Sequence, residues 1–317
     1  MQGREMHIFD TQSYLYAGGF YSRRRVSLPV EQSGGMYRAM EMDVSSSVYL
    51  MNEISKYRKP GVDLVFAFDS PPWIKRNAYR ELFGINGYKD GRAEKPIWLE
   101  PNKMLCYEML KQIGLNTFMI ENYESDDIIA SIVKYYRKDY EHIYVHTRDS
   151  DLTHLVGDNV TIEPCNRQGK HIDIYNYEES VKKDCIVRYN TAIVNRLCFK
   201  AKDNVPLVPK KWRSVIDLGI PKDVYSKCGD SALLRVWVSR LTNDDPMVMG
   251  IYDLIVPIIL DGELVELEEE EFNITAYNYY ATMLGCEGTE YLTTPDYPTG
   301  EETFLRWIKD YKERGGE

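Results

Sequence analysis

The sequence predicts an α/β fold in which a mixed, mostly parallel sheet is flanked by helices. In the first two thirds of the 317 residues, short apolar runs alternate with longer amphipathic ones, as strands alternate with helices in such folds. From about residue 180 the pattern becomes helical. We therefore expect an α/β domain over residues 1–180 and a helical part over residues 181–317.

Four short apolar runs are the predicted strands. They are "MHIFD" at residues 6–10, "VDLVFAFD" at residues 62–69, "TFMIE" at residues 117–121 and "HIYVHTRDSD" at residues 142–151. Three of these four runs end in Asp. If the strands are parallel and adjacent, their carboxyl ends share the edge at which open α/β sheets bind ligands.

Helical patterns fill most of the remaining chain. In the first domain they cover residues 44–57, 101–114 and 126–136, and Gly114 is the expected stop of the second helix. In the C-terminal part they cover residues 190–201, 211–218, 231–241 and 273–284. The run "LEEEEF" at residues 267–272 is predicted to be a solvated acidic face or loop, and "ETFLRWIKDYKER" an amphipathic helix packed on the body.

Composition restricts the class of protein. Apolar residues make up 44% and charged residues 28% of the chain, which is typical of a compact globular protein. The six cysteines show neither a CxxC pair nor a metal-finger spacing, so we expect buried reduced thiols in a cytoplasmic monomer. No run approaches the length of a membrane span. The net charge, 39 basic minus 49 acidic residues or −10, disfavours a polyanionic partner unless Lys and Arg gather locally.

Acidic residues crowd the ends of the predicted strands. In "YESDDIIASIV", three acids precede an apolar run where a single helix cap would suffice. The acids that would converge at the sheet edge are Asp10, Asp69, Glu124, Asp126, Asp127, Asp149 and Asp151. Each acid alone could be a cap or a turn former, but capping does not explain why strand after strand ends in acid.

Such a cluster requires compensation, because neighbouring like charges raise one another's pKa. Divalent cations supply it, and oxygen-only ligands suit Mg²⁺ or Mn²⁺. Two such ions about 3.5–4 Å apart stabilise both the attacking and the leaving oxygen in phosphodiester hydrolysis. The acids therefore predict a metal-dependent nuclease.

A basic and aromatic segment follows the second acidic strand. "SPPWIKRNAYRELFGINGYKDGR", residues 70–92, carries Trp73, Tyr79 and Tyr88 among its basic residues. The basic residues are Lys75, Arg76, Arg80, Lys89 and Arg92. Such a segment could hold a backbone phosphate over the metals while its aromatic rings stack on frayed bases. The alternative is a solvated helix with surface arginines.

These motifs, in this order, resemble those of the 5′-nuclease family. They are "FAFDSPP", the basic helix with "YKDGR", then "ESDD", "TRDSD" and "KDNVPLV". The family includes flap endonucleases, the 5′-nuclease domains of bacterial DNA polymerases and phage 5′-to-3′ exonucleases. The likeness covers residues 6–215 and is greatest to the phage ribonuclease H-type branch. It implies a PIN-like sheet and a helix–three-turn–helix that grips duplex DNA through a K⁺ ion.

The resemblance also implies roles for individual residues. It makes metal ligands of Asp10, Asp69, Glu124, Asp126, Asp149 and Asp151, with Asp127 as a further contributor and Asp203 as the last acid of a "GDxxDN" motif. It places residues 70–100 in a helical arch that passes a single-stranded 5′ end. The arch residues that bind DNA are Lys75, Arg76, Arg80, Tyr88, Lys89 and Arg92. Of these, Arg76, Arg80 and Lys89 would support the scissile phosphate.

The chain departs from the family pattern in "CFKAKDNVPLVPKKW", residues 198–212. Lys200 stands where the family has an Asp, so we expect two ions with the second site weakened; alternatively the Lys200 ammonium takes the place of the second cation. The glycine-rich turn is absent and Pro209 lacks an N–H, which argues against the K⁺ site and makes the helix–three-turn–helix degenerate. Lys210, Lys211 and Arg213 could still attract duplex phosphates directly.

The sequence thus predicts a Mg²⁺- or Mn²⁺-dependent 5′-nuclease. Its expected substrate is DNA with a 5′ end, flap or nick, with RNA–DNA hybrids as a candidate, in phage-type replication or repair beside replication proteins. A PIN-like endoribonuclease is an alternative, which the duplex-binding region of residues 190–212 disfavours. A catalytically weakened DNA-structure-binding protein is another, and a plain scaffold would leave the converging acids unexplained.

Overall fold

The computed structural model describes most of the α/β domain and part of the C-terminal region. The described residues are 4–21, 25–32, 36–84, 87–89, 92–165, 171, 173, 197, 203–216, 235, 238–240, 242–269 and 271–286. The predicted helices at residues 190–201 and 231–241 fall mostly outside this set, and the C-terminal amphipathic helix and Lys200 fall wholly outside it. The degenerate helix–three-turn–helix is described only from residue 203 onward, apart from residue 197.

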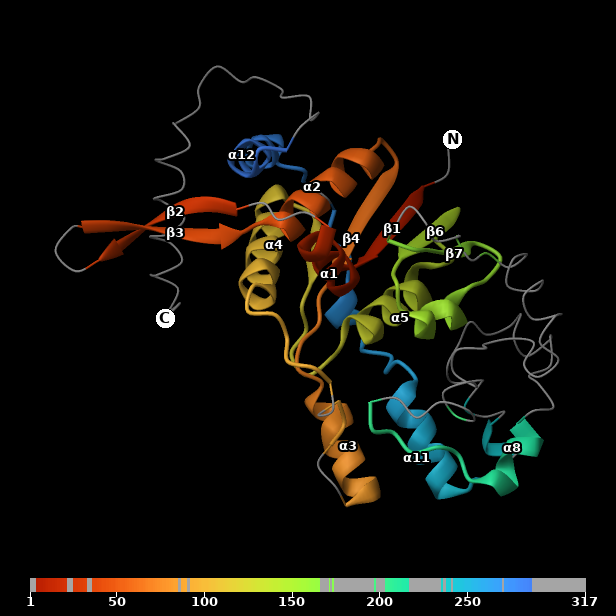
Figure 1. Ribbon diagram of the computed structural model, residues 1–317. Helices are drawn as coiled ribbons and strands as arrows, with labels where there is room; N and C mark the ends of the chain where they lie inside the picture. Colours follow the sequence, from red (N-terminus) through yellow and green to blue (C-terminus); the bar gives the residue numbers. More distant parts are fainter. Residues whose placement is uncertain are drawn as a thin grey trace.

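Five parallel strands form the central sheet (Figure 1). Their order across the sheet is β5 (Asn116–Phe118), β4 (Val62–Ala67), β1 (Glu5–Asp10), β6 (His142–His146) and β7 (Val160–Glu163). Asp10 at the end of β1 is in register with Ala67 at the end of β4, and Ala67 with Phe118 at the end of β5. The predicted α/β sheet is confirmed, and its carboxyl ends share one edge.

Helices cover both faces of this sheet (Figure 1). One face carries α1 (Thr11–Tyr21), α2 (Ser45–Tyr57), α4 (Leu99–Ile113) and α12 (Ile274–Leu284). The other face carries α5 (Ser125–Tyr136) and the short 3₁₀ helices η1 (Ser150–Leu155) and η2 (Gly262–Val265). The result is a three-layer α/β/α arrangement, which the alternation of apolar side chains along the strands requires.

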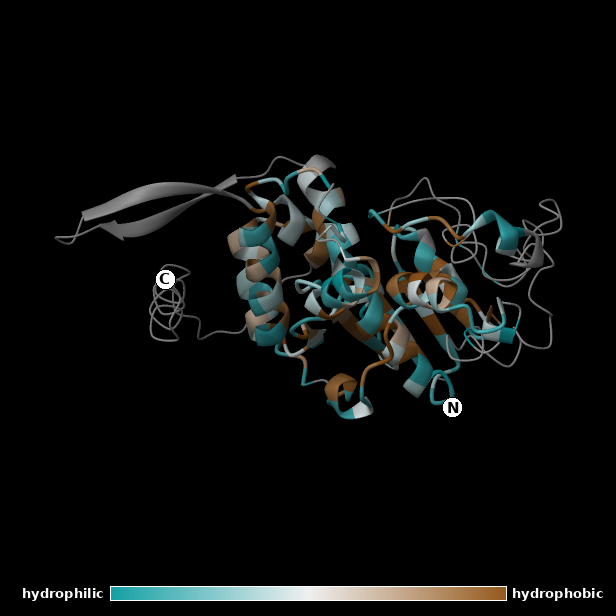
Figure 2. Ribbon diagram, turned by 90° about the horizontal axis from the view of Figure 1, so that it is seen from below, coloured by the Kyte–Doolittle hydropathy of each residue, from teal (hydrophilic) through white to brown (hydrophobic). Residues whose placement is uncertain are grey.

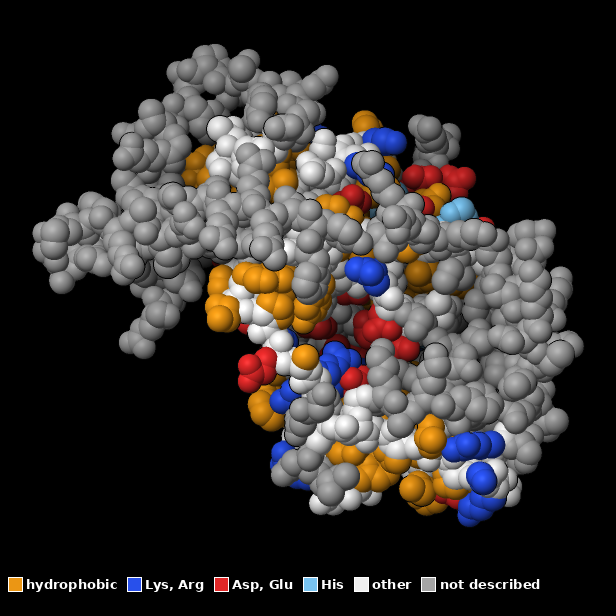
Figure 3. All heavy atoms as spheres, in the orientation of Figure 1, with side chains coloured by type: hydrophobic (Ala, Val, Ile, Leu, Met, Phe, Trp, Pro, Cys, Tyr) orange, Lys and Arg blue, Asp and Glu red, His pale blue; other side chains and the backbone are white. Residues whose placement is uncertain are grey.

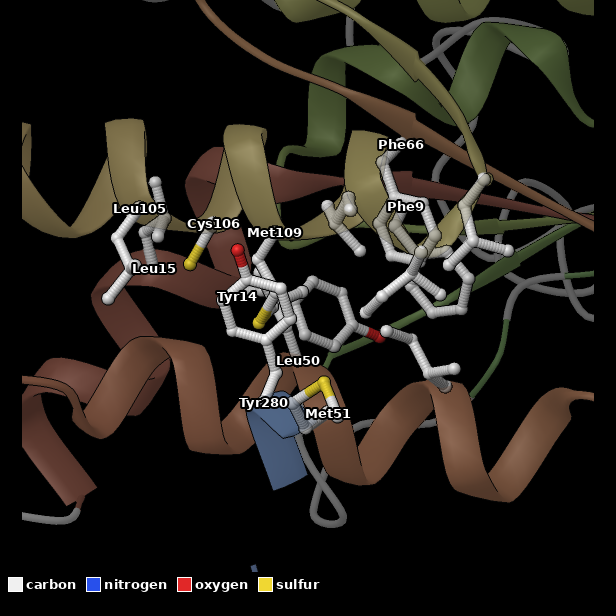
Figure 4. Close-up of a cluster of buried hydrophobic side chains, with 14 of the residues drawn as sticks. Phe9, Tyr14, Leu15, Leu50, Met51, Phe66, Leu105, Cys106, Met109 and Tyr280 are labelled. Carbon is white, nitrogen blue, oxygen red and sulfur yellow. The ribbon is translucent and has the colours of Figure 1, made fainter. Parts of the chain in front are cut away.

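Each face of the sheet has its own hydrophobic core. Phe9 and Phe66 point to the first face, where their rings stack 4.8 Å apart and meet Leu50 and Met109 (Figure 4). Ile8 and the strand residues next to Phe66 in sequence point to the other face, against α5. Full burial of each such side chain contributes about 1.5–3 kcal/mol. Figure 2 shows the hydrophobic colouring concentrated on the strands and on the helix sides that meet them.

A third core lies below the carboxyl edge of the sheet. It joins α3 (Trp73–Phe83) and Tyr88 to α11 (Pro246–Ile255) and to Val205 and Val208, with Trp212 of α8 (Lys210–Ile216) packed against it. The basic segment is therefore packed on the C-terminal region, whereas α12 of that region packs into the first core. The expected domain boundary near residue 180 lies among residues that are not described, so it stays a prediction.

Several elements differ from the sequence-based expectation. The strand predicted over residues 142–151 ends at His146, because Asp149 caps η1 and its side chain accepts a hydrogen bond from the Asp151 amide. The sequence analysis did not predict α1, β7, α11, η2 or the antiparallel hairpin of β2 (Arg25–Gln32) and β3 (Met36–Asp43), which extends away from the body (Figure 1).

Gly114 ends α4 as expected, and its surroundings explain why. Its φ of 80° is in the left-handed region, which glycine adopts without a side-chain penalty. A Cβ at this position would lie 2.2 Å from the carbonyl oxygen of Glu271, in the acidic run that the sequence analysis assigned to a face or loop. The glycine therefore lets the C-terminal region pass directly over the end of α4.

Two smaller expectations concern cysteines and membranes. Cys106, Cys165 and Cys286 are buried free thiols, as predicted; the other three cysteines lie outside the described residues. Within the described part of the chain, no helix is both long and apolar enough to cross a membrane.

Candidate metal and phosphate site

A hollow of about 290 Å³ opens at the carboxyl edge of the sheet. Figure 3 shows Asp and Glu atoms gathered in the middle of this face, with Lys and Arg atoms beside them. The residues that line the hollow are Asp10, Gln12, Ser13, Tyr16, Asp69, Lys89, Arg92, Glu124, Ser125, Asp126, Arg148 and Asp149. Five of the predicted acids therefore meet in one place.

The five acids come from four segments that follow four neighbouring strands. Asp10 is the last residue of β1, and Asp69 follows β4 by two residues. Glu124 and Asp126 lie at the start of α5, after β5, and Asp149 follows β6. The parallel register brings these strand ends together, so the convergence predicted from the sequence is produced by the sheet itself.

Asp10 is one of the two buried acids that line the hollow, with 4% of the residue exposed. Its Oδ2 accepts hydrogen bonds from Ser13 Oγ at 2.5 Å and Thr147 Oγ1 at 2.7 Å. Burial raises the pKa of Asp10 to about 6; the Ser13 and Thr147 hydrogen bonds oppose this shift, and the charges of Asp69 and Asp149 add to it.

Asp126 experiences the same crowding. Burial raises its pKa well above the ordinary Asp value, and the neighbouring charges, Asp149 first and then Asp10, raise it further. Hydrogen bonds from hydroxyl groups do not remove the mutual repulsion of these carboxylates. A bound cation would remove it.

Ser125 connects two of the acids. Its hydroxyl lies 2.9 Å from Asp69 Oδ1 and 3.3 Å from Asp10 Oδ1, and its backbone amide also donates to Asp69 Oδ1 at 2.9 Å. Because Ser125 is the first residue of α5, the start of this helix orients the carboxylates that lie at the ends of the paired strands β1 and β4.

Glu124 is held by two lysines. Lys75 Nζ lies 3.0 Å from its Oε2, and Lys89 Nζ forms a very short ion pair with its Oε1. Burial alone would raise the pKa of Glu124, but the two ammonium groups outweigh burial and lower it to about 2. Glu124 is therefore ionised throughout the physiological pH range.

Asp203 lies beside the hollow rather than among its lining residues. Its carboxylate forms a bidentate ion pair with Arg92, at 2.6 Å from Nε to Oδ1 and 2.8 Å from Nη2 to Oδ2. The backbone continues this attachment, because the Lys89 amide donates to the Asp203 carbonyl at 3.1 Å. The "KDN" motif is thus docked on the 87–92 segment.

Three predicted site residues lie outside the hollow lining, and their roles at the site stay predictions. Asp127 accepts from the Ile258 and Glu124 amides at 2.7 and 3.0 Å and pairs with Lys75 at 2.9 Å, so both of its oxygens are engaged away from the hollow. Lys75 is 5% exposed, which removes it from a phosphate's reach in this arrangement. Asp151 is 5% exposed and also lies outside the lining.

The remaining predicted DNA-binding residues lie away from the hollow. Arg80 is exposed on α3, and Arg76 on the same helix lies over the Trp73 ring, 5.1 Å from its centroid. On α8, Lys210 and Lys211 are exposed, and Arg213 Nε donates to the Val208 carbonyl at 3.0 Å. Tyr88 is buried in the third core with its hydroxyl 3.4 Å from Glu124 Oε2. Their roles in DNA binding stay predictions.

The sequence analysis did not identify the hydroxyl residues that hold the acids. Ser13, Ser125 and Thr147 all lie in or beside the hollow and donate to its carboxylates. The signal was present, because "DTQS", "ESDD" and "TRDSD" each place a hydroxyl residue within three positions of a predicted acid. Hydroxyl donors of this kind are what a buried carboxylate requires.

The hollow fits a hard divalent cation in donor type and charge. Five carboxylates and three cationic side chains line it, which leaves two negative charges, and the acidic donors are all oxygen atoms. Among the described residues, however, no three acidic, His or Cys side chains already form a coordinating group. Oxygens of Asp10, Asp69 and Glu124 are turned toward Ser, Thr and Lys partners, so ion binding by these three carboxylates would require some of them to rotate.

An open parallel sheet covered by helices on both faces, with an acidic hollow at its carboxyl edge, defines this protein as an α/β protein with a candidate ligand site at its strand ends. The chain belongs to the family described as "5′-3′ exonuclease, N-terminal resolvase-like domain", whose model matches residues 5–185. This agrees with the resemblance seen in the motifs.

Individual relatives agree with this assignment. The chain is 28% identical over 203 residues to a 5′-3′ exonuclease of Buchnera aphidicola, a match that covers 64% of this chain and 65% of the relative. It is 29% identical over 122 residues to DNA polymerase I of Bacillus subtilis, which covers 38% of this chain and 14% of the polymerase. The matches thus span less than two thirds of these relatives.

A solved structure shares the fold. The D15 protein of phage T5, co-crystallised with metal ions, superposes with a TM-score of 0.52 and 13% sequence identity, over 98% of this chain and 99% of that one. At this level of identity the likeness concerns the fold alone.

Proposed function

We propose that this protein is a metal-dependent 5′-nuclease that hydrolyses phosphodiesters of DNA, as a 5′-to-3′ exonuclease or a flap endonuclease. One observation carries the proposal: five carboxylates from four chain segments meet in a hollow that also holds Lys89, Arg92 and Arg148. Clustered oxygens attract divalent cations, and the flanking cations attract a phosphate to the same place. Membership of the exonuclease family supports the same reaction.

In the proposed reaction, a water oxygen bonds to phosphorus as the bond from phosphorus to the 3′ oxygen breaks. The 3′ oxygen leaves in line and takes a proton, so the products carry a 3′ hydroxyl and a 5′ phosphate. Mg²⁺ or Mn²⁺, when bound, would activate the water and neutralise charge on the leaving oxygen. Asp10, Asp69, Asp126 and Asp149 would hold the ions, and Ser125 would keep two of these acids in place.

The proposed substrate is DNA with a free 5′ end, flap or nick. α3 carries Trp73, which is 47% exposed, and the arginines Arg76 and Arg80. The helix lies below the carboxyl edge of the sheet, where we propose that a single strand passes (Figure 1). The exposed lysines of α8 are proposed to contact the duplex. RNA primers in RNA–DNA hybrids are a second proposed substrate, and primer removal in phage-type replication is the proposed setting, with replication proteins as proposed partners.

The number of ions depends on the region around Lys200. The sequence places a lysine where the family pattern has an acid, and we propose that this substitution weakens a second ion site. Lys200→Asp should then lower the Mg²⁺ concentration required for cleavage. If Lys200→Asp left that requirement unchanged, the weakened-site proposal would lose its support.

Cleavage of a labelled 5′ flap, with Mg²⁺ and with EDTA, tests the function. We expect product only with Mg²⁺, and a loss of at least about 100-fold in rate for Asp149→Ala and Asp126→Ala. Asp158→Ala is the matched control, because Asp158 is an exposed acid on the same domain outside the hollow lining. Flap binding without any metal-dependent product would identify a DNA-structure-binding protein instead. Cleavage restricted to RNA strands would favour the endoribonuclease alternative.

A further inference from the structure

We infer that Lys89 and Arg92 are tethered counter-ions that exchange with divalent cations. Without ligands, Lys89 pairs with Glu124 and Arg92 pairs with Asp203. A phosphate that binds Lys89 and Arg92 releases both carboxylates, which can then bind a divalent ion. Phosphate and divalent ions therefore bind cooperatively. This inference rests on the proposed function, because it concerns the same hollow. It adds a coupling between the two kinds of ligand.

The contacts of Glu124 provide the first observation. Its two carboxylate oxygens have different lysine partners: Lys75 on Oε2 and Lys89 on Oε1. Lys75 also pairs with Asp127 at 2.9 Å and does not line the hollow, so it is a fixed part of the framework. Lys89 lines the hollow and its side chain is 15% exposed. Only the second lysine is placed to leave Glu124 for a ligand in the hollow.

The pair of Arg92 and Asp203 provides the second observation. Arg92 lines the hollow and its side chain is 51% exposed, whereas the Asp203 side chain is 5% exposed. The guanidinium therefore faces both the solvent-filled hollow and the buried carboxylate. A planar guanidinium that binds a carboxylate with two parallel hydrogen bonds can bind a phosphate in the same way.

The backbone unites the two cations. Lys89 has a φ of 65°, a left-handed conformation that is unfavourable for a non-glycine residue and is found most often at functional sites. The Arg92 amide donates to the Lys89 carbonyl at 3.2 Å, and the Lys89 amide donates to the Asp203 carbonyl. One turn thus places the side chains of Lys89 and Arg92 in the hollow lining and attaches them to Asp203. A single phosphate in the hollow can therefore bind both side chains.

Charge makes the exchange favourable in both directions. A carboxylate whose oxygens are hydrogen-bonded to an ammonium or a guanidinium is a poor ligand for a metal ion, and a buried carboxylate that loses its basic partner requires another cation. When a phosphate binds Lys89 and Arg92, the carboxylates of Glu124 and Asp203 lose these partners. A divalent ion can then replace the lost positive charges. Linkage requires the reverse effect to be equal, so bound ions must also promote phosphate binding.

Mn²⁺ titration of the intact protein, followed by electron paramagnetic resonance, tests this coupling. The phosphate probe is thymidine 5′-monophosphate, which contains no internucleotide bond to hydrolyse, and its own Mn²⁺ binding is measured without protein. We expect the monophosphate to raise the Mn²⁺ affinity of the protein at least about fivefold. We also expect Mn²⁺ to increase acylation of the Lys89 amine in the wild-type chain, while Lys75 remains protected.

Variants separate exchange from general electrostatics. Lys89→Met should raise the Mn²⁺ affinity in the absence of phosphate at least about fivefold more than Arg148→Met, and should abolish the effect of the monophosphate. Arg148 also lines the hollow but holds no carboxylate among the described residues, so it controls for the loss of one positive charge. Lys95→Met, which removes an exposed lysine paired with Glu100 outside the hollow, should have no effect.

The possible outcomes distinguish this inference from the proposed function. If the wild-type chain binds Mn²⁺ but the monophosphate leaves the affinity unchanged, or if Lys89→Met and Arg148→Met have equal effects, the inference is wrong and the proposed function stands. If the wild-type chain binds no Mn²⁺, both are wrong. Should Lys89→Met fail to fold, the acylation of Lys89 in the wild-type chain decides: unchanged labelling on adding Mn²⁺ would contradict the exchange.

Discussion

At the scale of single residues, the hydroxyl groups determine how the acids are arranged. The Ser125 hydroxyl lies within hydrogen-bond distance of both Asp10 and Asp69, so it orients these two carboxylates without removing their repulsion. Outer partners of this kind orient metal ligands, and their loss commonly costs 10–100-fold in metal affinity or activity. We therefore propose that Ser125 is a positioning residue, which acts on the proposed metal site through the acids it binds.

Ser125→Ala is expected to raise the Mg²⁺ concentration needed for flap cleavage about 10- to 100-fold, because it removes the hydroxyl shared by the two acids. Ser131→Ala is the matched control on the same helix. The Ser131 hydroxyl donates to the Asp127 carbonyl and accepts from the Leu260 amide, so its loss should cost about 1–3 kcal/mol of unfolding free energy without changing the Mg²⁺ requirement. Equal Mg²⁺ requirements for the two variants would contradict a positioning role for Ser125.

The acids could be predicted from the sequence, but their partners could not. Asp10 and Asp69 stand at the ends of apolar runs, and that pattern is visible in the sequence alone. The bidentate pair of Arg92 with Asp203 spans 111 residues, so only the folded chain reveals it. Asp127 shows the converse: its place in the acidic run suggested a ligand, whereas the helix turns it toward Lys75 and the Ile258 amide.

At the scale of elements, strands β1 and β6 are joined by a column of rings as well as by their backbone. His7 and His146 are hydrogen-bonded at 2.8 Å and stacked, and Tyr57 and Tyr144 flank His7. Burial lowers the pKa of His7 to about 4, aided by Lys56, Lys59 and His142. Burial, with smaller contributions from His7 and Lys56, lowers the pKa of His146 well below 6.5, although Glu163 lies 3.4 Å away.

This column predicts a loss of stability in mild acid. Between pH about 4 and 6.5 the unfolded chain binds more protons at His7 than the folded chain, so the contribution of neutral His7 is present above pH 6.5 and is lost as the pH falls. Each such histidine contributes up to about 1.4 kcal/mol per pH unit in this range.

Urea unfolding from pH 7 to pH 5, with Mg²⁺ present to neutralise the acidic hollow, measures the slope. His7→Phe keeps a ring in the column but cannot be protonated, so it should reduce the slope by up to about 1.4 kcal/mol per pH unit. Tyr144→Phe removes a neighbouring hydroxyl and should leave the slope unchanged. If the unfolding free energy of His7→Phe depended on pH as steeply as that of the wild-type chain, His7 would not be the group that causes the loss of stability in mild acid.

The elements that escaped prediction share a physical reason. α1 packs Tyr14, Leu15 and Ala17 into the first core with glycines at its far end, so it shows no apolar stripe of helical period. Residues 160–163 of β7 are too short to stand out as a strand, and they are stabilised by pairing with β6. Where an element carried its own signal, as Gly114 did for the end of α4, the sequence was sufficient.

At the scale of the whole molecule, two groups of basic residues lie on the same side of the sheet as the acidic hollow. The chain carries a net charge of −10, so attraction to DNA depends on where the positive charges lie. The arginines of α3 and the lysines of α8 both lie below the carboxyl edge of the sheet, on separate helices that the third core joins (Figure 1). This layout suits a substrate with a single-stranded arm and a duplex arm.

The salt dependence of binding can separate these two arms. Removing one cationic side chain that binds a phosphate should reduce the slope of log K against log salt by about 0.9 for a duplex and about 0.7 for a single strand. We expect Lys210→Gln with Lys211→Gln to lower the slope for a duplex and leave that for a single strand unchanged. Arg76→Gln with Arg80→Gln should lower the slope for the single strand alone.

Fluorescence anisotropy in EDTA, between about 50 and 200 mM salt, measures both slopes without cleavage. Lys138→Gln is the control, because Lys138 is exposed beyond the end of α5, at the opposite edge of the sheet from the hollow. Lys211 also lies 3.7 Å from Asp245, so Lys210 should account for the larger share of the duplex effect. If both double variants lowered both slopes equally, DNA binding would depend on overall charge, and the assignment of separate arms to α3 and α8 would be wrong.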